Sequence, residues 1–155
     1  MDNWIETEGS PFVIVEQQYA KQWNGQEYYD AVCSVTDYLG KIYINDHAVL
    51  VMGDEPMAVR IIQQEGRILI IRWMYAPNHN AVDRLLECDI IEGLEPIEEI
   101  GVEWDSNQLV IFDSLYRFCE ASVKAYMTLQ ATSCIIRTYY YKKDDIALII
   151  HSIQQ

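Results

Sequence analysis

Basic residues are scarce in this sequence. Only 11 lysines and arginines stand against 24 aspartates and glutamates, which gives a formal net charge of -13. Nucleic acids and anionic membrane surfaces bind through basic groups, so we expect neither as a partner. A basic protein would be attracted and steered by such a charge, although acidity also serves solubility alone. The composition therefore leaves two interpretations open, a basic protein partner or acidity that serves solubility alone.

Paired cysteine motifs are also missing. None of the four cysteines stands in a C-x-x-C arrangement, which disfavours a zinc site or a thioredoxin-like redox motif. A chain that is 50% hydrophobic at this length does not need a disulfide framework. We therefore expect free, mostly buried thiols of an intracellular protein. They are Cys33, Cys88, Cys119 and Cys134.

No targeting or membrane segment is evident. The first ten residues, MDNWIETEGS, are acidic and lack the basic and apolar regions of a signal peptide. No apolar run approaches the roughly 20 residues of a transmembrane helix. The expected compartment is the cytoplasm. The length of 155 residues predicts a single globular domain over residues 1–155.

Catalytic and cofactor motifs are absent. The sequence contains no G-x-G-x-x-G, P-loop, H-E-x-x-H, EF-hand or G-x-S-x-G pattern. Its histidines, His47, His79 and His151, stand far apart, and His79 with Asp83 would supply only two metal ligands. His151 lies in an apolar segment, where we expect an interior or edge histidine. We expect no enzymatic activity, no metal and no cofactor.

Hydrophobic alternation is the main structural signal that is present. Residues 67–75 are apolar on both faces, which predicts a central strand covered on both sides. Glu65-Gly66 predicts a hairpin between this segment and 57–64, and residues 105–107 predict another. Further short strands are expected at 11–15, 41–45, 48–52, 102–104, 108–113, 121–130, 133–141 and 146–153.

Helical signals are few. Short helices are predicted at about 16–23, ending at a C-cap at Asn24-Gly25, and at 79–88, opened by a capping box at Asn80 and Asp83. The pattern of residues 26–40 does not distinguish between a helix and a strand. About eight or nine strands against one or two helices predict a mainly β or α+β fold. Antiparallel sheets would pack as a sandwich or an open barrel.

Acidic residues gather in one part of the chain. Between Arg84 and Arg117 there are nine acids and no base. The run EGLEPIEEIG, residues 92–101, interleaves acids with apolar residues, which suits either a partner surface or a solvated loop. Gly53-Asp54-Glu55-Pro56 adds two acids at a turn, where Gly53 gives the chain freedom to bend. The candidate partner contacts are Asp54, Glu55, Glu92, Glu95, Glu98 and Glu99.

Three consecutive tyrosines, Tyr139, Tyr140 and Tyr141, are predicted on one strand. Successive side chains of a strand point to opposite faces, so Tyr140 must face away from the other two. Tyrosine is enriched at interfaces, but it also packs in cores. At least one of the two faces is expected to be core.

Several short motifs occur in order over nearly the whole chain, although each is weak alone. They are WIETEGSP (4–11), WNG (23–25), YDAVCSVTDYLG (29–40), GDEP (53–56), RWMYA (72–76), IFDS (111–114), RTYYY (137–141) and ALIIH (147–151). Together these motifs resemble the immunity protein 21 family of bacterial polymorphic-toxin systems.

The resemblance implies a protein without enzymatic activity that binds a cognate toxin domain and blocks it. The acidity is compatible with a basic toxin such as a nuclease, because complementary charge speeds encounter. Two alternatives stay open on the residues alone. One is a small-ligand or regulatory β-sandwich module with aromatics lining a pocket, and the other is a carboxylate enzyme that uses a metal.

Overall fold

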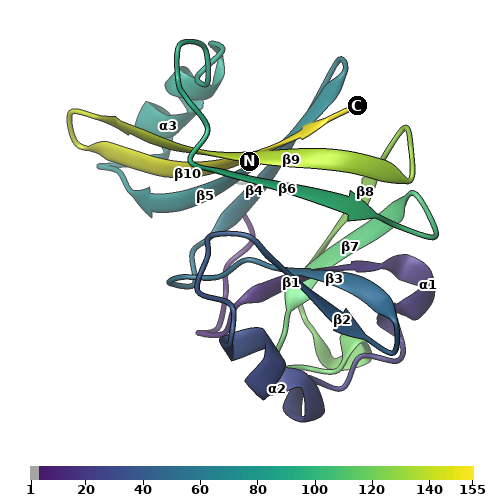
Figure 1. The fold of residues 1–155 in the computed structure, drawn as a ribbon. Helices are drawn as coiled ribbons and strands as arrows, with labels where there is room; N and C mark the ends of the chain where they lie inside the picture. The colour runs from purple at the N-terminus through teal and green to yellow at the C-terminus, as the bar shows by residue number, and fades with distance from the viewer. Residues whose placement is uncertain (1–3) are drawn as a thin grey trace.

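Two five-stranded antiparallel sheets face each other in the computed structural model, which describes residues 4–155 (Figure 1). The first three residues of the acidic start lie outside this range. The first sheet has the order β2 (Gly40–Ile44), β3 (His47–Val51), β1 (Phe12–Glu16), β7 (Gln108–Asp113), β8 (Lys124–Thr128). The second has the order β4 (Val59–Gln64), β5 (Arg67–Tyr75), β10 (Ile146–Gln154), β9 (Ser133–Lys143), β6 (Glu98–Glu103). This confirms the predicted mainly β sandwich.

Apolar side chains fill three layers, because most strands are hydrophobic on both faces. In β5, Ile68 and Ile70 point between the sheets, whereas Leu69 and Ile71 point to the outer face. The predicted central strand is confirmed, since β5 is paired on both sides. The layer between the sheets includes Phe12, Ile14, Leu50, Ile68, Ile70, Leu109, Ile111, Ile136 and Ile153.

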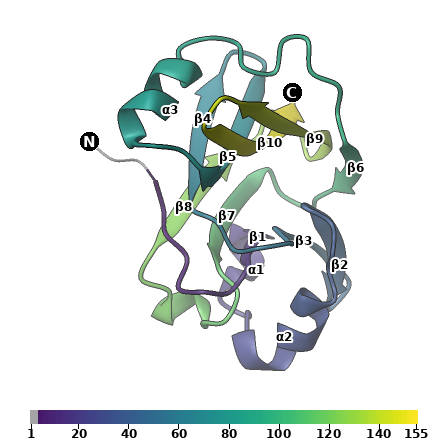
Figure 2. The same cartoon turned by 90° about the vertical axis from the view of Figure 1, so that its left-hand side faces the viewer.

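Short helices cover the two outer faces. Figure 2 shows α3 (His79–Leu86) over the second sheet and α2 (Gly25–Cys33) below the first. The remaining helices are α1 (Gln17–Ala20) and a 3-10 turn, Phe118–Glu120. Among the described residues, no helix is long and apolar enough to span a membrane.

The predicted end of the first helix is wrong. Asn24 and Gly25 do not cap a helix that is ending; Asn24 precedes the first turn of α2, and the predicted 16–23 helix is only the single turn α1. Gly25 is required by a close approach, because a Cβ there would lie 2.0 Å from the backbone oxygen of Leu115. The open segment 26–40 is therefore helical up to Cys33.

The cap of α3 is placed differently from the prediction. Asn78, not Asn80, accepts a hydrogen bond from the backbone N–H of Ala81 at 2.9 Å. Asp83 is instead bound to Arg60 at 2.7 Å, so its carboxylate joins the helix to β4. The helix itself occupies the predicted place but ends at Leu86.

The hairpin predicted at residues 105–107 is wrong. β6 pairs with β9 in the second sheet, whereas β7 pairs with β1 and β8 in the first. The chain therefore crosses between sheets at this turn. The hairpin at Glu65-Gly66 is confirmed, and Gly66 has the positive φ (79°) that favours glycine there.

All four cysteines are free, as predicted, but most are not buried. Cys33, Cys88 and Cys119 are exposed, and Cys134 is half-buried. Each of the three exposed cysteines lies in a helical turn at the surface or just after one. The apolar character of a cysteine side chain is too weak to bury it at such a position.

Candidate partner-binding surface

A buried arginine organises one end of the sandwich. Arg72 is only 1% exposed, and its guanidinium donates to the backbone oxygens of Tyr38 (2.8 Å), Gly53 (2.6 Å) and Glu55 (3.2 Å). Burial lowers the pKa of Arg72 to about 10, although nearby Asp54 and Glu98 oppose the shift. The side chain therefore stays charged at neutral pH and ties β5 to two loops of the first sheet.

Glu98 completes this connection from the edge strand β6. Its two carboxylate oxygens accept the backbone N–H groups of Tyr38 (2.9 Å) and Leu39 (3.1 Å). Gly53 also donates its N–H to the Tyr38 oxygen at 3.0 Å. The loops 34–39 and 53–57 are thus held against each other and against both sheets.

In the GDEP turn, Gly53 is required by a close approach rather than by the expected freedom to bend. The residue with positive φ is Asp54 (63°), not Gly53. Gly53 is needed because a Cβ would lie 2.2 Å from the backbone oxygen of Asp37. Glycine therefore allows the two loops to touch, and the turn projects the exposed carboxylates of Asp54 and Glu55 outward.

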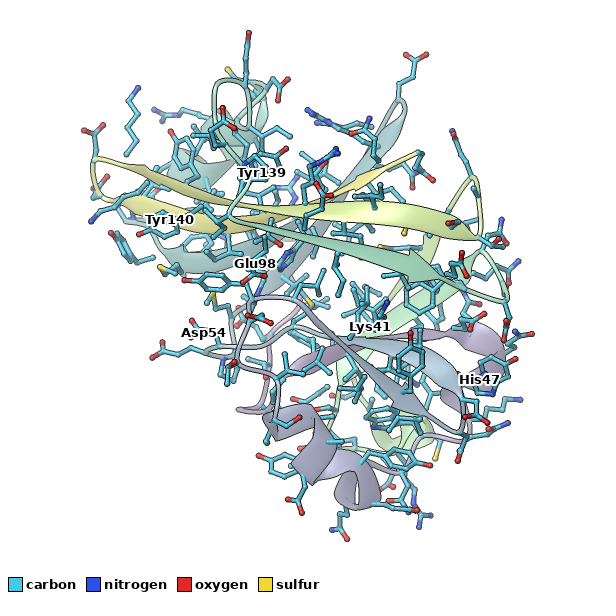
Figure 3. The ribbon with its side chains drawn as sticks, viewed as in Figure 1. Lys41, His47, Asp54, Glu98, Tyr139 and Tyr140 are labelled. Atoms are coloured by element: carbon cyan, nitrogen blue, oxygen red, sulfur yellow. The ribbon has the colours of Figure 1, made fainter. Side chains whose placement is uncertain are left out.

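Acids and tyrosines are gathered around these loops. Tyr38 is half-buried, and Asp54, Tyr140 and Glu98 lie close enough to add to the burial that raises the pKa of its hydroxyl. Figure 3 shows Asp54, Glu98 and Tyr140 at the same end of the molecule, opposite His47. We name the exposed and half-exposed part of this group the loop-end surface: Asp37, Tyr38, Asp54, Glu55 and Tyr140.

The three consecutive tyrosines divide as strand geometry requires. Tyr139 and Tyr141 are half-buried and pack on the outer face of the second sheet. Tyr140 points the other way and is 36% exposed. Tyr139 and Tyr141 are therefore packing residues, and only Tyr140 contributes to the loop-end surface.

The six predicted contact residues do not form one cluster. Asp54, Glu55 and Glu98 come together, but the carboxylate of Glu98 is already occupied by backbone groups. Glu99 binds Arg137 at 2.9 Å. The exposed Glu92 and Glu95 belong to the stretch that connects α3 to β6 (Figure 1).

A second polar group lies at the opposite end of the sandwich. The ring of Tyr19 stacks on His47 with centroids 3.5 Å apart, and its hydroxyl donates to Asp105 at 2.9 Å. The buried Glu16 accepts the backbone N–H of Ser106, and its pKa is raised chiefly by burial. These contacts fix the crossing from β6 to β7.

A hollow lined by aromatic residues is too small for a metabolite, whereas a larger, open hollow of about 850 Å³ is lined mostly by polar residues of 24–27 and 115–120. Within residues 4–155, no three His, Cys, Asp or Glu side chains are grouped so that they could hold a metal ion. The aromatic hollow, whose lining includes Tyr19, Trp23 and Tyr28, has a volume of about 20 Å³. That is room for a water molecule, whereas metabolite pockets are larger by more than tenfold.

The sequence did not reveal two residues on which the loop-end surface depends, Tyr38 and the buried Arg72. Arg72 is the only charged residue on the inward face of a strand that otherwise carries Ile68, Ile70 and Met74. A charge on an apolar face was the available signal, because arginine is rarely buried without partners. Tyr38 had no comparable signal, since its role depends on the contact between two loops.

Comparison with known proteins identifies the family. A model of the family described as immunity protein 21 matches residues 3–145. Searches of curated proteins and of solved structures found no match. The matched range includes every motif on which the sequence resemblance rested except ALIIH (147–151), which lies entirely beyond residue 145. The chain therefore belongs to the immunity protein 21 family.

Proposed function

We propose that this protein neutralises a cognate toxin domain by direct contact, without enzymatic activity, in the cytoplasm of the cell that it protects. Membership of an immunity protein family supports such a role. The toxin is expected to be basic, for example a nuclease, and nucleic acid itself is not a ligand. The observation that carries the proposal is a surface of exposed acids and tyrosines fixed on a buried arginine.

The loop-end surface has the chemistry of a protein interface. Tyr38 and Tyr140 offer large side chains with little conformational freedom to lose on binding. Asp54 and Glu55 carry exposed carboxylates that would attract a basic partner. Because Arg72 binds the loop backbone from beneath, these side chains are presented on a preorganised support, which lowers the cost of association.

Association kinetics with the toxin domain encoded beside this chain's gene would test the proposal. The double variant Asp54→Lys with Glu55→Lys should slow association about tenfold at low salt, since rim charges act mainly on the on-rate. Glu65→Lys with Glu87→Lys changes the charge equally at exposed positions on other elements and should have a smaller effect.

A third variant distinguishes the two groups of predicted contacts. If Glu92→Lys with Glu95→Lys slows association and the Asp54 and Glu55 variant does not, the contact lies on the stretch between α3 and β6. Absence of any association of the wild-type protein at low salt, together with no rescue of growth on co-expression, would refute toxin neutralisation itself.

A further inference from the structure

The outer edge of β6 presents unpaired backbone groups. Antiparallel ladders alternate between pairs that exchange hydrogen bonds and pairs whose N–H and C=O groups point away. The backbone bond from Trp104 to Thr132 (2.8 Å) and the regular register with β9 fix this alternation. The peptide groups of Glu99, Gly101 and Glu103 consequently point away from β9, toward the open edge.

The side chains along this edge leave room for another strand. Gly101 is paired with Ile135, and a Cβ at Gly101 would have no atom within 4 Å. Since glycine has no side chain to cover it, Ile135 is 45% exposed. Exposed Glu99 and Glu103 stand two residues to either side. An apolar spot is thus framed by two carboxylates, of which that of Glu99 already binds Arg137.

Among residues 4–155, one side chain, that of Lys41, hydrogen-bonds to the outer edge of β6. The ammonium group of Lys41, from β2, donates to the Gly101 backbone oxygen at 2.9 Å (Figure 3 labels Lys41). Lysine is a common guard of exposed strand edges. Lys41 is itself exposed, so an incoming strand displaces it without uncovering the core.

The other outer edges of the two sheets are less suited to a basic strand. At β4, Ile5 already pairs with Val59 through hydrogen bonds in both directions (2.8 and 2.9 Å). β8 carries a base, Lys124, and no acid between Lys124 and Thr128, and β2 likewise carries Lys41 and no acid between Gly40 and Ile44. Pairing with Ile5 therefore distinguishes β4 from β6, and charge distinguishes β8 and β2 from β6.

We propose that the outer edge of β6 accepts an extended, basic segment of the toxin domain as an added strand. This rests on the proposed function and continues the loop-end surface, which Glu98 joins to the start of β6. The added strand hydrogen-bonds to the peptide groups of Glu99, Gly101 and Glu103. It places an apolar or long side chain over Gly101 and Ile135, and basic side chains beside the two glutamates.

Proline substitution on two edges tests this inference. Gly101→Pro removes an outward N–H and should weaken binding of the toxin domain about tenfold or more, mainly through faster dissociation. Tyr126→Pro is the matched control on β8. The backbone hydrogen bond from the Leu129 N–H to the Asn107 oxygen fixes the alternation along β8, so that the N–H of Tyr126 also points outward. This control should bind within about twofold of the wild-type protein.

Hydrogen exchange of the wild-type complex provides a test that does not depend on a variant folding. Addition of the toxin domain should slow exchange at the amides of Glu99, Gly101 and Glu103 and leave the amide of Tyr126 unchanged. If Gly101→Pro binds like the wild type, or if those three amides exchange as before, strand addition at β6 is overturned while toxin binding stands. If the wild-type protein does not bind the toxin domain, both proposals fall.

Discussion

At the scale of single residues, Arg72 has an uncommon role. Its guanidinium is buried without a direct carboxylate partner. Its two terminal nitrogens donate hydrogen bonds to three backbone oxygens from two loops. Burying a charge in this way costs free energy unless the geometry of its hydrogen bonds is good. The planar fork of arginine matches that geometry, whereas a lysine ammonium does not.

Replacing Arg72 with lysine should therefore destabilise the protein although the charge is retained. We expect a loss of about 3 kcal/mol, because the backbone oxygens of Gly53 and Glu55 would lose their donors in a buried place. Urea unfolding followed by circular dichroism measures this loss. An unchanged midpoint would show that the loops do not depend on the guanidinium.

His151 makes stability depend on pH. It is fully buried, its Nδ1 lies 2.8 Å from the Thr138 hydroxyl, and burial followed by the Arg72 charge lowers its pKa well below 6.5. The unfolded chain takes up a proton at this histidine below about pH 6.5, whereas the folded chain does not. Acidification through that pH therefore favours the unfolded state.

The variant His151→Gln should reduce this dependence. Comparing the free energy of unfolding of the two proteins at pH 7, 6 and 5 isolates the histidine, whose full effect is about 1.4 kcal/mol per pH unit. Glu16 acts in the opposite sense, since burial raises its pKa and its protonation favours the folded state. It is present in both proteins, so it cancels. Equal slopes for the two proteins would contradict the prediction.

Residue-scale predictions from sequence succeeded where strand geometry alone decides. The opposite facing of Tyr140 and Tyr139 follows from the period of a strand, and the interior position of His151 follows from its apolar neighbours. The occupied carboxylate of Glu98 could not be foreseen, because its partners lie some 60 residues away in a loop.

At the scale of elements, the contact between loops 34–39 and 53–57 depends on a missing side chain. Gly53→Ala would place a Cβ 2.2 Å from the Asp37 backbone oxygen, so one loop must move. We expect a loss of about 2 kcal/mol and weaker toxin binding, because the loop-end surface is built on this contact. Thermal unfolding and binding of the toxin domain measure the two effects.

Gly101→Ala is the matched control for stability. The new Cβ has open space in the strand β6, so its effect should lie within about 0.5 kcal/mol of zero. Equal losses for the two variants would show that the close approach at Gly53 is not what requires glycine.

Strand pairing could be predicted from the sequence where two strands are joined by a tight turn, but not where the paired strands are distant in the chain. The hairpin at Glu65-Gly66 is set by its own turn residues and could be predicted. The turn at 105–107 has similar residues, but its flanking strands enter different sheets. The residues of a turn do not reveal with which other strands the two flanking strands will pair.

At the scale of the whole molecule, both sheets contribute to the layer between them. We therefore expect a single cooperative unfolding transition, in keeping with one domain. Three tryptophans report separate layers: Trp104 between the sheets, and Trp23 and Trp73 on the two outer faces. Tryptophan fluorescence and far-ultraviolet circular dichroism should give coincident curves in urea. Two separate transitions would instead show that the sheets unfold independently.

The pairing of β1 with β7 has a consequence for the timing of synthesis. All five residues of β1 are buried, yet Phe12 pairs with Asp113, roughly a hundred residues later in the chain. On the ribosome, this apolar strand emerges early and waits for its neighbour, and such non-local pairing folds slowly. Under the proposed function, the cell must therefore finish making this protein well before the toxin becomes active.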